Sequence, residues 1–237
     1  MSMRTAAQQH GWGLKQVPAL PDVTFARTRR LDARARAMVV PHWSEIDERD
    51  VTAGATGVQR TLIDCMRMLP LDESLPILDS AVRADDVSPD DVRRIADSMN
   101  GRGRTRARGV AALVDGRCTN PFESTLRAIG STVPGLGLVP QLGIKISERR
   151  TLHPDLADPA LGLIVEAESF AWHGKSAALT RDCWRYNTFT LLGWTVIRFS
   201  WFQVMQRREY VLGALEEASR LLHRHANVAR GAVDRPL

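Results

Sequence analysis

The most restrictive feature of this 237-residue sequence is the apolar run Leu161–Ser169, which carries two glutamates near its end. Its Leu-Gly-Leu-Ile-Val start predicts a strand buried on both faces, as in sheets that are flanked by helices. Because side chains alternate along a strand, Glu166 and Glu168 fall on the same face, with backbones roughly 6–7 Å apart. Two like charges at the end of a buried strand indicate either a bound divalent cation or a strand that has reached solvent.

The segments around this run predict an α/β fold with a small mixed sheet flanked by helices. Hydrophobic spacing and start signals predict helices over 120–131, 177–192 and 203–223. Alternating or continuous apolar residues predict strands over 138–147, 152–157, 161–169 and 194–200.

The N-terminal region has a different composition, because eleven of the fourteen aromatic residues lie at or after Phe122. Helical spacing predicts helices over 58–69 and 72–84, and a third that begins with the Ser88-Pro89-Asp90-Asp91 start signal. Short strands are expected over 22–26 and 37–40. We therefore expect a mainly helical region over 1–107, an α/β domain over 108–228 and a tail over 229–237.

Positive charge is concentrated in two arginine clusters. The chain has 32 Lys plus Arg against 27 Asp plus Glu, and only three of the 32 are lysines. Such a preference is typical of a GC-rich genome, although guanidinium groups also bind phosphate oxygens bidentately. The first cluster consists of Arg27, Arg29, Arg30, Arg34 and Arg36, and the second, in the glycine-rich segment 101–109, of Arg102, Arg104, Arg106 and Arg108. Each is either a solvated surface or a nucleic-acid contact.

The cysteines and the hydropathy profile bear on the cell compartment. Cys65, Cys118 and Cys183 lack the paired spacing of a zinc site or a disulfide framework, so we expect buried thiols in a reducing cytosol. No apolar run approaches the roughly 18 residues that a membrane span needs, and the first 30 residues lack a signal-peptide core. The sequence predicts a cytoplasmic protein without a membrane partner.

Asp155 adds a third carboxylate to the two on the apolar run. It lies in the segment Leu152–Leu156, eleven residues before Glu166, which leaves room for a hairpin that joins the strand ends. This arrangement, Pro154-Asp155 followed by Glu166 and Glu168, resembles the core motif of PD-(D/E)xK nucleases. The resemblance implies a restriction-endonuclease-like fold for the domain over 108–228, with Asp155 and Glu166 holding the metal. Glu168 stands where most members have a lysine, so its expected role is that of a third acidic ligand or a water-positioning group.

Residues further along strengthen and narrow this resemblance. They are Phe170-Ala171-Trp172-His173, then Arg181-Asp182 with Arg185-Tyr186-Asn187, then Gly193-Trp194 with Val196 and Arg198. Over residues 108–223 the pattern is similar to the very-short-patch-repair (Vsr-like) endonuclease branch of the superfamily and to its bacterial relatives of unknown function. It implies a Mg²⁺ or Mn²⁺ cofactor, a DNA substrate and His173 as the proton-transfer residue.

Glu123, Arg181 and Arg185 each have two interpretations. The relatives carry a Glu-Ser-x-x-Arg sequence, matched here by Glu123–Arg127, whose glutamate adds a metal ligand; equally, Glu123 three residues after Asn120 forms a capping box. Arg181 and Arg185 share a helical face, from which they reach either a DNA phosphate or nearby acids.

Two functions of different classes follow. The first is a metal-dependent DNA endonuclease that hydrolyses phosphodiester bonds with an activated water. The second is a catalytically inactive, DNA-binding regulator of the nuclease fold, since the whole-chain layout also resembles AbiEi-type antitoxins, which often begin with a winged-helix domain. The missing lysine favours the regulator and the retained acids favour the enzyme; Lys145 or Lys175 could replace the lysine. A protein-interaction module and a homodimer are left open.

Overall fold

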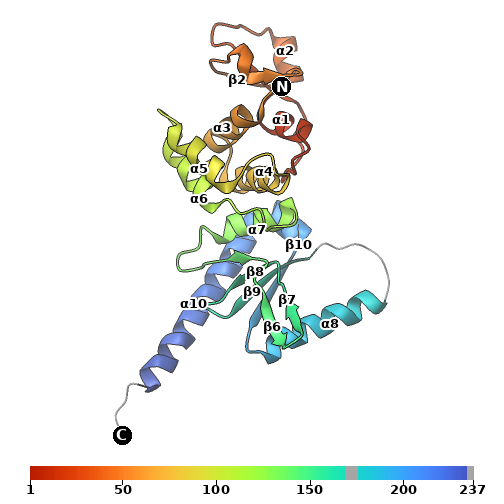
Figure 1. Cartoon of the computed structure of the whole chain (residues 1–237), viewed down its shortest axis with the longest axis vertical. Helices are drawn as coiled ribbons and strands as arrows, with labels where there is room; N and C mark the ends of the chain where they lie inside the picture. The colour runs from red at the N-terminus through yellow and green to blue at the C-terminus, as the bar shows by residue number, and fades with distance from the viewer. Residues whose placement is uncertain (169–175, 234–237) are drawn as a thin grey trace. The chain divides into compact units, whose positions relative to one another are not determined.

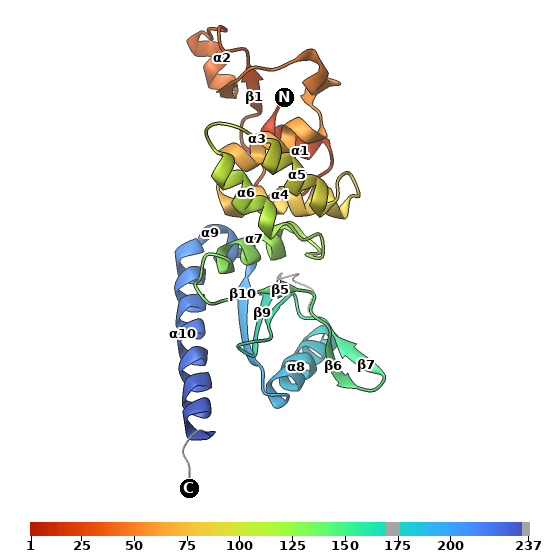
Figure 2. The same ribbon diagram turned by 60° about the vertical axis from the view of Figure 1, so that its left-hand side comes forward.

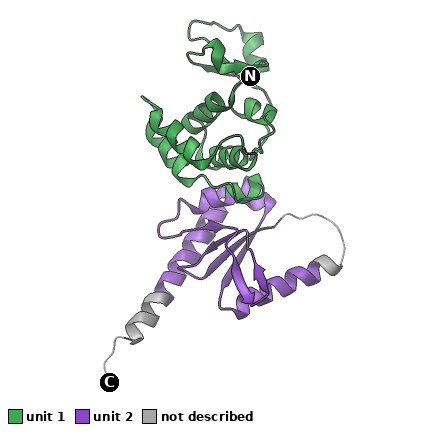
Figure 3. Ribbon diagram, in the orientation of Figure 1, with its two compact units in different colours: residues 1–125 green, residues 126–237 purple. Residues whose placement is uncertain are grey.

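The computed structural model describes residues 1–168 and 176–233, and the chain divides into two compact units, Met1–Thr125 and Leu126–Leu237 (Figure 3). The division falls inside helix α7 (Pro121–Gly130), while the boundary expected after residue 107 lies within helix α6 (Arg104–Leu113). The fold is mixed α/β, as the sequence predicts.

The first unit is built around five helices whose inward faces carry small and branched apolar side chains. The helices are α1 (Met3–Gln9), α3 (Val58–Met68), α4 (Leu71–Arg83), α5 (Pro89–Ser98) and α6. Leu62 and Leu75 are fully buried at the centre. The three helices predicted between 58 and 99 are confirmed, and the capping box at the start of α5 forms between Ser88 and Asp91.

The strands of the first unit are short and occur in pairs. β1 (Asp22–Phe25) runs parallel to β2 (Val40–Trp43), and β3 (Val51–Thr52) pairs with β4 (Ala55–Thr56), after the 3₁₀ turn η1 (Glu48–Asp50). The expected strand over 37–40 is wrong for most of its length, because helix α2 (Ala33–Met38) covers residues 37–38 and β2 begins only at Val40. Asp32 caps α2 by accepting a hydrogen bond from the N–H of Ala35, and the alternating Ala and Arg residues favour a helix.

The second unit contains a four-stranded sheet in the order β10-β9-β8-β5 (Figure 1). Its strands are β5 (Val139–Pro140), β8 (Leu156–Asp158), β9 (Leu163–Glu168) and β10 (Thr195–Ser200). β9 is parallel to β10 and antiparallel to β8, so the sheet is mixed, as expected. Leu163, Ile164 and Val165 are fully buried, which confirms that the apolar run is a central strand.

Two predicted strands are each divided. The expected strand 138–147 becomes β5 and β6 (Ile144–Ser147), because Gln141 has a positive φ of 52° and breaks the extended chain. The expected strand 152–157 becomes β7 (Arg150–Leu152) and β8, on either side of Pro154. β6 and β7 form a separate hairpin.

Helices α8 (Ser176–Leu191) and α10 (Arg208–Val233) lie on opposite sides of this sheet in both ribbon views (Figures 1 and 2). Phe189 of α8 packs in a buried cluster with Ile144, Ala157 and Ile164. The predicted closing helix is two helices, α9 (Trp201–Gln206) and α10, because the chain leaves the helical conformation at Arg207. α7 approaches its neighbours closely at Gly130, where a Cβ would lie 2.4 Å from Leu138.

Cys65 and Cys118 are buried free thiols, as expected, but Cys183 is exposed on α8, and its expected burial is wrong. In the part of the chain that the structure describes, no helix combines the length and apolarity that crossing a bilayer requires.

Candidate active site

The pairing of β8 with β9 brings Asp155 and Glu166 together. Leu156 lies opposite Val165 in the antiparallel ladder, so Asp155, one residue before the strand, comes to the level of Glu166. The backbone N–H of Asp155 donates to Glu166 Oε2 at 3.3 Å, and the N–H of Ala167 donates to Asp155 Oδ2 at 2.8 Å. Each carboxylate is therefore held by the backbone of the other strand.

Burial of this carboxyl pair makes it costly for both groups to be charged. Glu166 is only 3% exposed. Loss of hydration and the neighbouring charge of Glu166 raise the pKa of Asp155 from 3.8 to about 7, against the opposing effects of the Ala167 N–H and of Arg185. Without a further cation, the pair consequently retains a proton up to neutral pH.

Arg185 of α8 is the cation that already contacts the pair. Its Nε and Nη2 donate to Glu166 Oε1 at 3.2 and 2.9 Å, and Nη2 also donates to the carbonyl of His153 at 2.6 Å. Its position follows from the packing of α8, because Phe189 covers Ile164 one turn further along the helix. Four residues on a helix rise about 6 Å, close to the two-residue step from Ile164 to Glu166 on the strand.

Glu168 shares the face of Glu166 but has partners of its own. The hydroxyl of Tyr186 donates to Glu168 Oε1, and the Nε of Arg198 donates to the same oxygen at 3.0 Å. The guanidinium of Arg198 also lies 4.0 Å from the centroid of the Tyr186 ring. The structure thus separates the predicted carboxylates into a pair, Asp155 with Glu166, and a single glutamate held by Tyr186 and Arg198.

Sequence reasoning assigned no role to Tyr186 or Arg198, although both stand in the motifs of the resemblance. The available signal was the strand pattern: Arg198 is the residue of β10 in register with Glu166, so its side chain falls on the face of the two glutamates. A basic residue on the strand next to two like charges indicates charge compensation.

The remaining predicted catalytic residue, His173, lies outside the described residues.

Within residues 1–168 and 176–233, no three His, Cys, Asp or Glu side chains converge in a way that could hold a metal ion. Two carboxylates nevertheless fit Mg²⁺, which is commonly held by one or two carboxylates, with waters and substrate phosphates completing its coordination. Asp155 and Glu166 are the residues that could hold such an ion.

Glu123 has the contacts of a helix cap. Its carboxylate accepts hydrogen bonds from the N–H of Thr119 at 2.8 Å, from the Thr119 hydroxyl and from the side-chain amide of Asn120 at 2.7 Å. In return, Asn120 Oδ1 accepts from the N–H of Glu123 at 3.0 Å. These bonds lie at the start of α7 and form a helix cap around a carboxylate that is 4% exposed.

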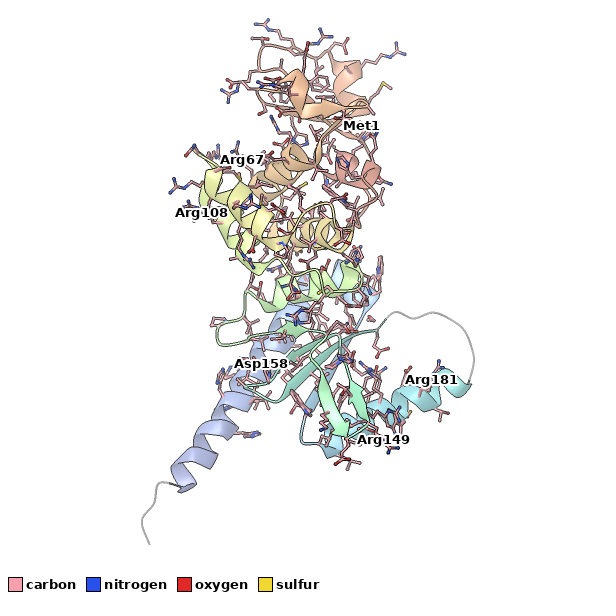
Figure 4. The ribbon with its side chains drawn as sticks, in the orientation of Figure 1. Met1, Arg67, Arg108, Arg149, Asp158 and Arg181 are labelled. Carbon is pink, nitrogen blue, oxygen red and sulfur yellow. The ribbon has the colours of Figure 1, made fainter. Side chains whose placement is uncertain are left out.

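The six arginines expected to bind nucleic acid have different environments. Arg102, Arg104, Arg106 and Arg108 are exposed at the start of α6, and Arg108 pairs with Asp97 at 2.9 Å. Arg181 is exposed on α8 (Figure 4), whereas Arg185, one turn later, contacts Glu166. Of the two interpretations of Arg185, the structure shows the pairing with an acid.

Comparison with known proteins finds similar chains of unknown function. The chain is 29% identical over 148 residues, 60% of its length, to the uncharacterized proteins MT2308 and Rv2248 from two strains of Mycobacterium tuberculosis. It spans about half the length of these curated relatives, 53% of each. No protein-family model matches the chain, and no solved structure matches it significantly.

Proposed function

We propose that the second unit is a restriction-endonuclease-like, Vsr-like domain that cleaves DNA with a Mg²⁺ or Mn²⁺ ion held by Asp155 and Glu166. The observation that carries the proposal is the convergence of these two carboxylates from adjacent strands, with the pKa of Asp155 raised to about 7. A buried pair of acids that repel each other is poised to take up a cation.

The residues around the pair have separable tasks in this proposal. A bound divalent ion would supply charge stabilisation and a more acidic water for phosphodiester hydrolysis. Asp155 and Glu166 would hold the ion, and the Ala167 N–H orients Asp155. Arg185 binds both Glu166 and the carbonyl of His153, and so connects β9 to the segment before β8. Glu168, which Tyr186 and Arg198 hold in place, would position the water for hydrolysis.

A second function is favoured by the arginines. Arg185 contacts Glu166 and Arg198 contacts Glu168, so each glutamate of β9 has a guanidinium partner within the protein. Such compensation suits a domain of this fold that binds DNA and has lost catalysis, as in the antitoxin-like alternative. The two functions differ in metal binding and cleavage, and both include DNA as the partner.

The deciding experiment combines cleavage with metal binding. Wild type, Asp155→Asn and Glu166→Gln are incubated with supercoiled plasmid and Mg²⁺ or Mn²⁺, and Mn²⁺ binding is measured by calorimetry. Glu148→Gln, which removes an exposed carboxylate from the same unit, is the matched control. The nuclease proposal requires nicking by wild type and by the control, and loss of both nicking and Mn²⁺ binding in the other variants.

Plasmid retention on a gel without nicking, and without Mn²⁺ binding by any variant, would instead establish the regulator. Nicking that survives Asp155→Asn unchanged would refute the assigned site and point to contaminating nuclease.

A further inference from the structure

A cavity of about 980 Å³ lies within the first unit and is lined by members of both arginine clusters of the sequence, Arg27 from the first and Arg102 and Arg106 from the second. Its walls come from β1, β2, α3 and the turn that precedes α6. The charged side chains that line it are Arg27, Arg67, Arg102, Arg106 and Asp64. Four arginines face one carboxylate, so the cavity favours an anion.

The charge of this cavity is poorly compensated by the protein itself. Asp64 is held by Arg60, whose Nε donates to it at 2.9 Å. Arg27 makes only a 3.8 Å approach to Glu45, and both of these side chains are largely exposed. Asp64 also attracts Arg67, but a single carboxylate against four arginines leaves the cavity with a net positive charge.

Arg67 supplies an independent sign of a missing partner (Figure 4). Its Nε is buried and, among the described residues, has no hydrogen-bond acceptor. A buried guanidinium N–H without an acceptor costs on the order of 1–3 kcal/mol or more, and such groups are uncommon in native proteins. An anionic ligand in the cavity would provide the acceptor.

The amino end of α6 reinforces the same wall. Gly103, which lines the cavity, is the N-cap of this ten-residue helix with a φ of 87°, and no side chain caps the first turn or adds an acid to it. A Cβ at this position would lie 2.6 Å from Cγ of Arg67, so glycine is needed both for the turn and for the close approach to Arg67. The free N–H end of a helix favours an anion.

Trp43 places an aromatic surface at this cavity. Its side chain lines the cavity and is 41% exposed, and its indole N–H is occupied by the carbonyl of Arg29 at 2.9 Å. With the N–H satisfied, the ring is the part of the side chain left to bind a ligand, and the guanidinium of Arg36 lies 5.6 Å from its centroid. An exposed indole beside several arginines is typical of sites where a base stacks and its phosphate is bound.

We propose that this cavity binds a nucleotide, with its phosphate at Arg67, Arg102 and Arg106 and its base against Trp43. The nucleotide is either free or part of a single DNA strand, since both present the same phosphate and base. The site uses none of the residues of the candidate active site and requires no metal.

The test measures binding by the full chain in EDTA. The probes are a fluorescein-labelled single-stranded oligodeoxythymidine, followed by anisotropy, and deoxythymidine monophosphate, followed by calorimetry. We expect Arg67→Met and Arg102→Met each to weaken binding about tenfold, the loss of one charge-assisted contact of about 1.4 kcal/mol. Trp43→Leu is expected to weaken it to a similar degree, and Trp43→Phe less.

Arg93→Met is the matched control, because Arg93 is an exposed arginine of the same unit that does not line the cavity. Arg102 is exposed, so Arg102→Met should fold and still tests the cavity if Arg67→Met does not fold. Binding of the oligonucleotide alone identifies a DNA strand as the ligand, and binding of the mononucleotide as well identifies a free nucleotide.

No binding of either probe, or equal losses in the cavity variants and in Arg93→Met, would overturn the proposal. Asp155→Asn is expected to retain nucleotide binding, so failure of the nuclease proposal and failure of this one give different results.

Discussion

Replacing Asp155 by Asn should change the pH dependence of stability of the second unit. The pKa of Asp155 is about 7 in the folded chain against 3.8 as its ordinary value, so the folded state binds the extra proton between about pH 4 and 7. Stability from this group is therefore complete below pH 4 and is lost as the pH rises through 7. A difference of about three pKa units corresponds to on the order of 4 kcal/mol.

Asn reproduces the protonated carboxyl without titrating. Its side-chain oxygen can accept from the Ala167 N–H, as Asp155 does now, and its amide can donate to Glu166. In metal-free buffer, wild type and Asp155→Asn should have similar free energies of unfolding near pH 4. Near pH 8 the variant should be more stable by on the order of 4 kcal/mol.

The assay is urea unfolding in EDTA at several pH values, followed by circular dichroism and tryptophan fluorescence, with one transition fitted for each unit. Glu148→Gln controls for the loss of one carboxylate. A stability difference that does not vary with pH, or that favours wild type as the pH rises, would refute the electrostatic argument. Added Mn²⁺ should stabilise wild type more at pH 8 than at pH 5, because the ion competes with the proton on Asp155.

Three further substitutions test other contacts by urea unfolding of the whole chain. Arg185→Met should destabilise the second unit by about 3 kcal/mol, because it leaves Glu166 buried without its guanidinium; a loss below about 1 kcal/mol would show that solvent compensates the charge. Asp158→Ala should lower the free energy of unfolding by about 3 kcal/mol, because it removes the acceptor of three backbone N–H groups. Asp158→Asn keeps one side-chain oxygen as an acceptor and should lose less stability. Gly103→Ala should destabilise the first unit by at least about 1 kcal/mol, since its φ is 87° and its Cβ would lie 2.6 Å from a side-chain carbon of α3; a neutral result would mean that the turn before α6 rearranges.

The sequence predicted those parts of the fold in which periodicity is strong and local. The apolar run Leu161–Ser169 predicted a buried strand, and Ser88 with Asp91 predicted a helix start. It failed where a single backbone position decides the outcome, as at Gln141, whose positive φ divides a strand. The expected strand at 37–40 was wrong because Asp32 caps a helix that continues to Met38.

The sequence predicted the acidic residues of the candidate site but not the arginines that contact them. Asp155 and Glu166 could be connected through a hairpin of eleven residues, a local relation that the sequence displays. The contacts of Arg185 and Arg198 depend on how α8 and β10 dock, and they join residues 19 to 30 positions apart. Because such docking is set by packing around Phe189, the partner arginines follow from tertiary structure.

The bond from Arg185 to the carbonyl of His153 also has a consequence for the order of folding. It joins residues 32 positions apart and connects the entry to β8 with a helix that follows β9. The hairpin of β8 and β9 can close before this helix docks, since shorter loops close at lower entropic cost. In that intermediate arrangement the carboxyl of Asp155 is still hydrated, so the burial that raises its pKa comes only in the final step. Acid conditions, which protonate Asp155, should therefore slow unfolding more than they accelerate the first pairing of the strands.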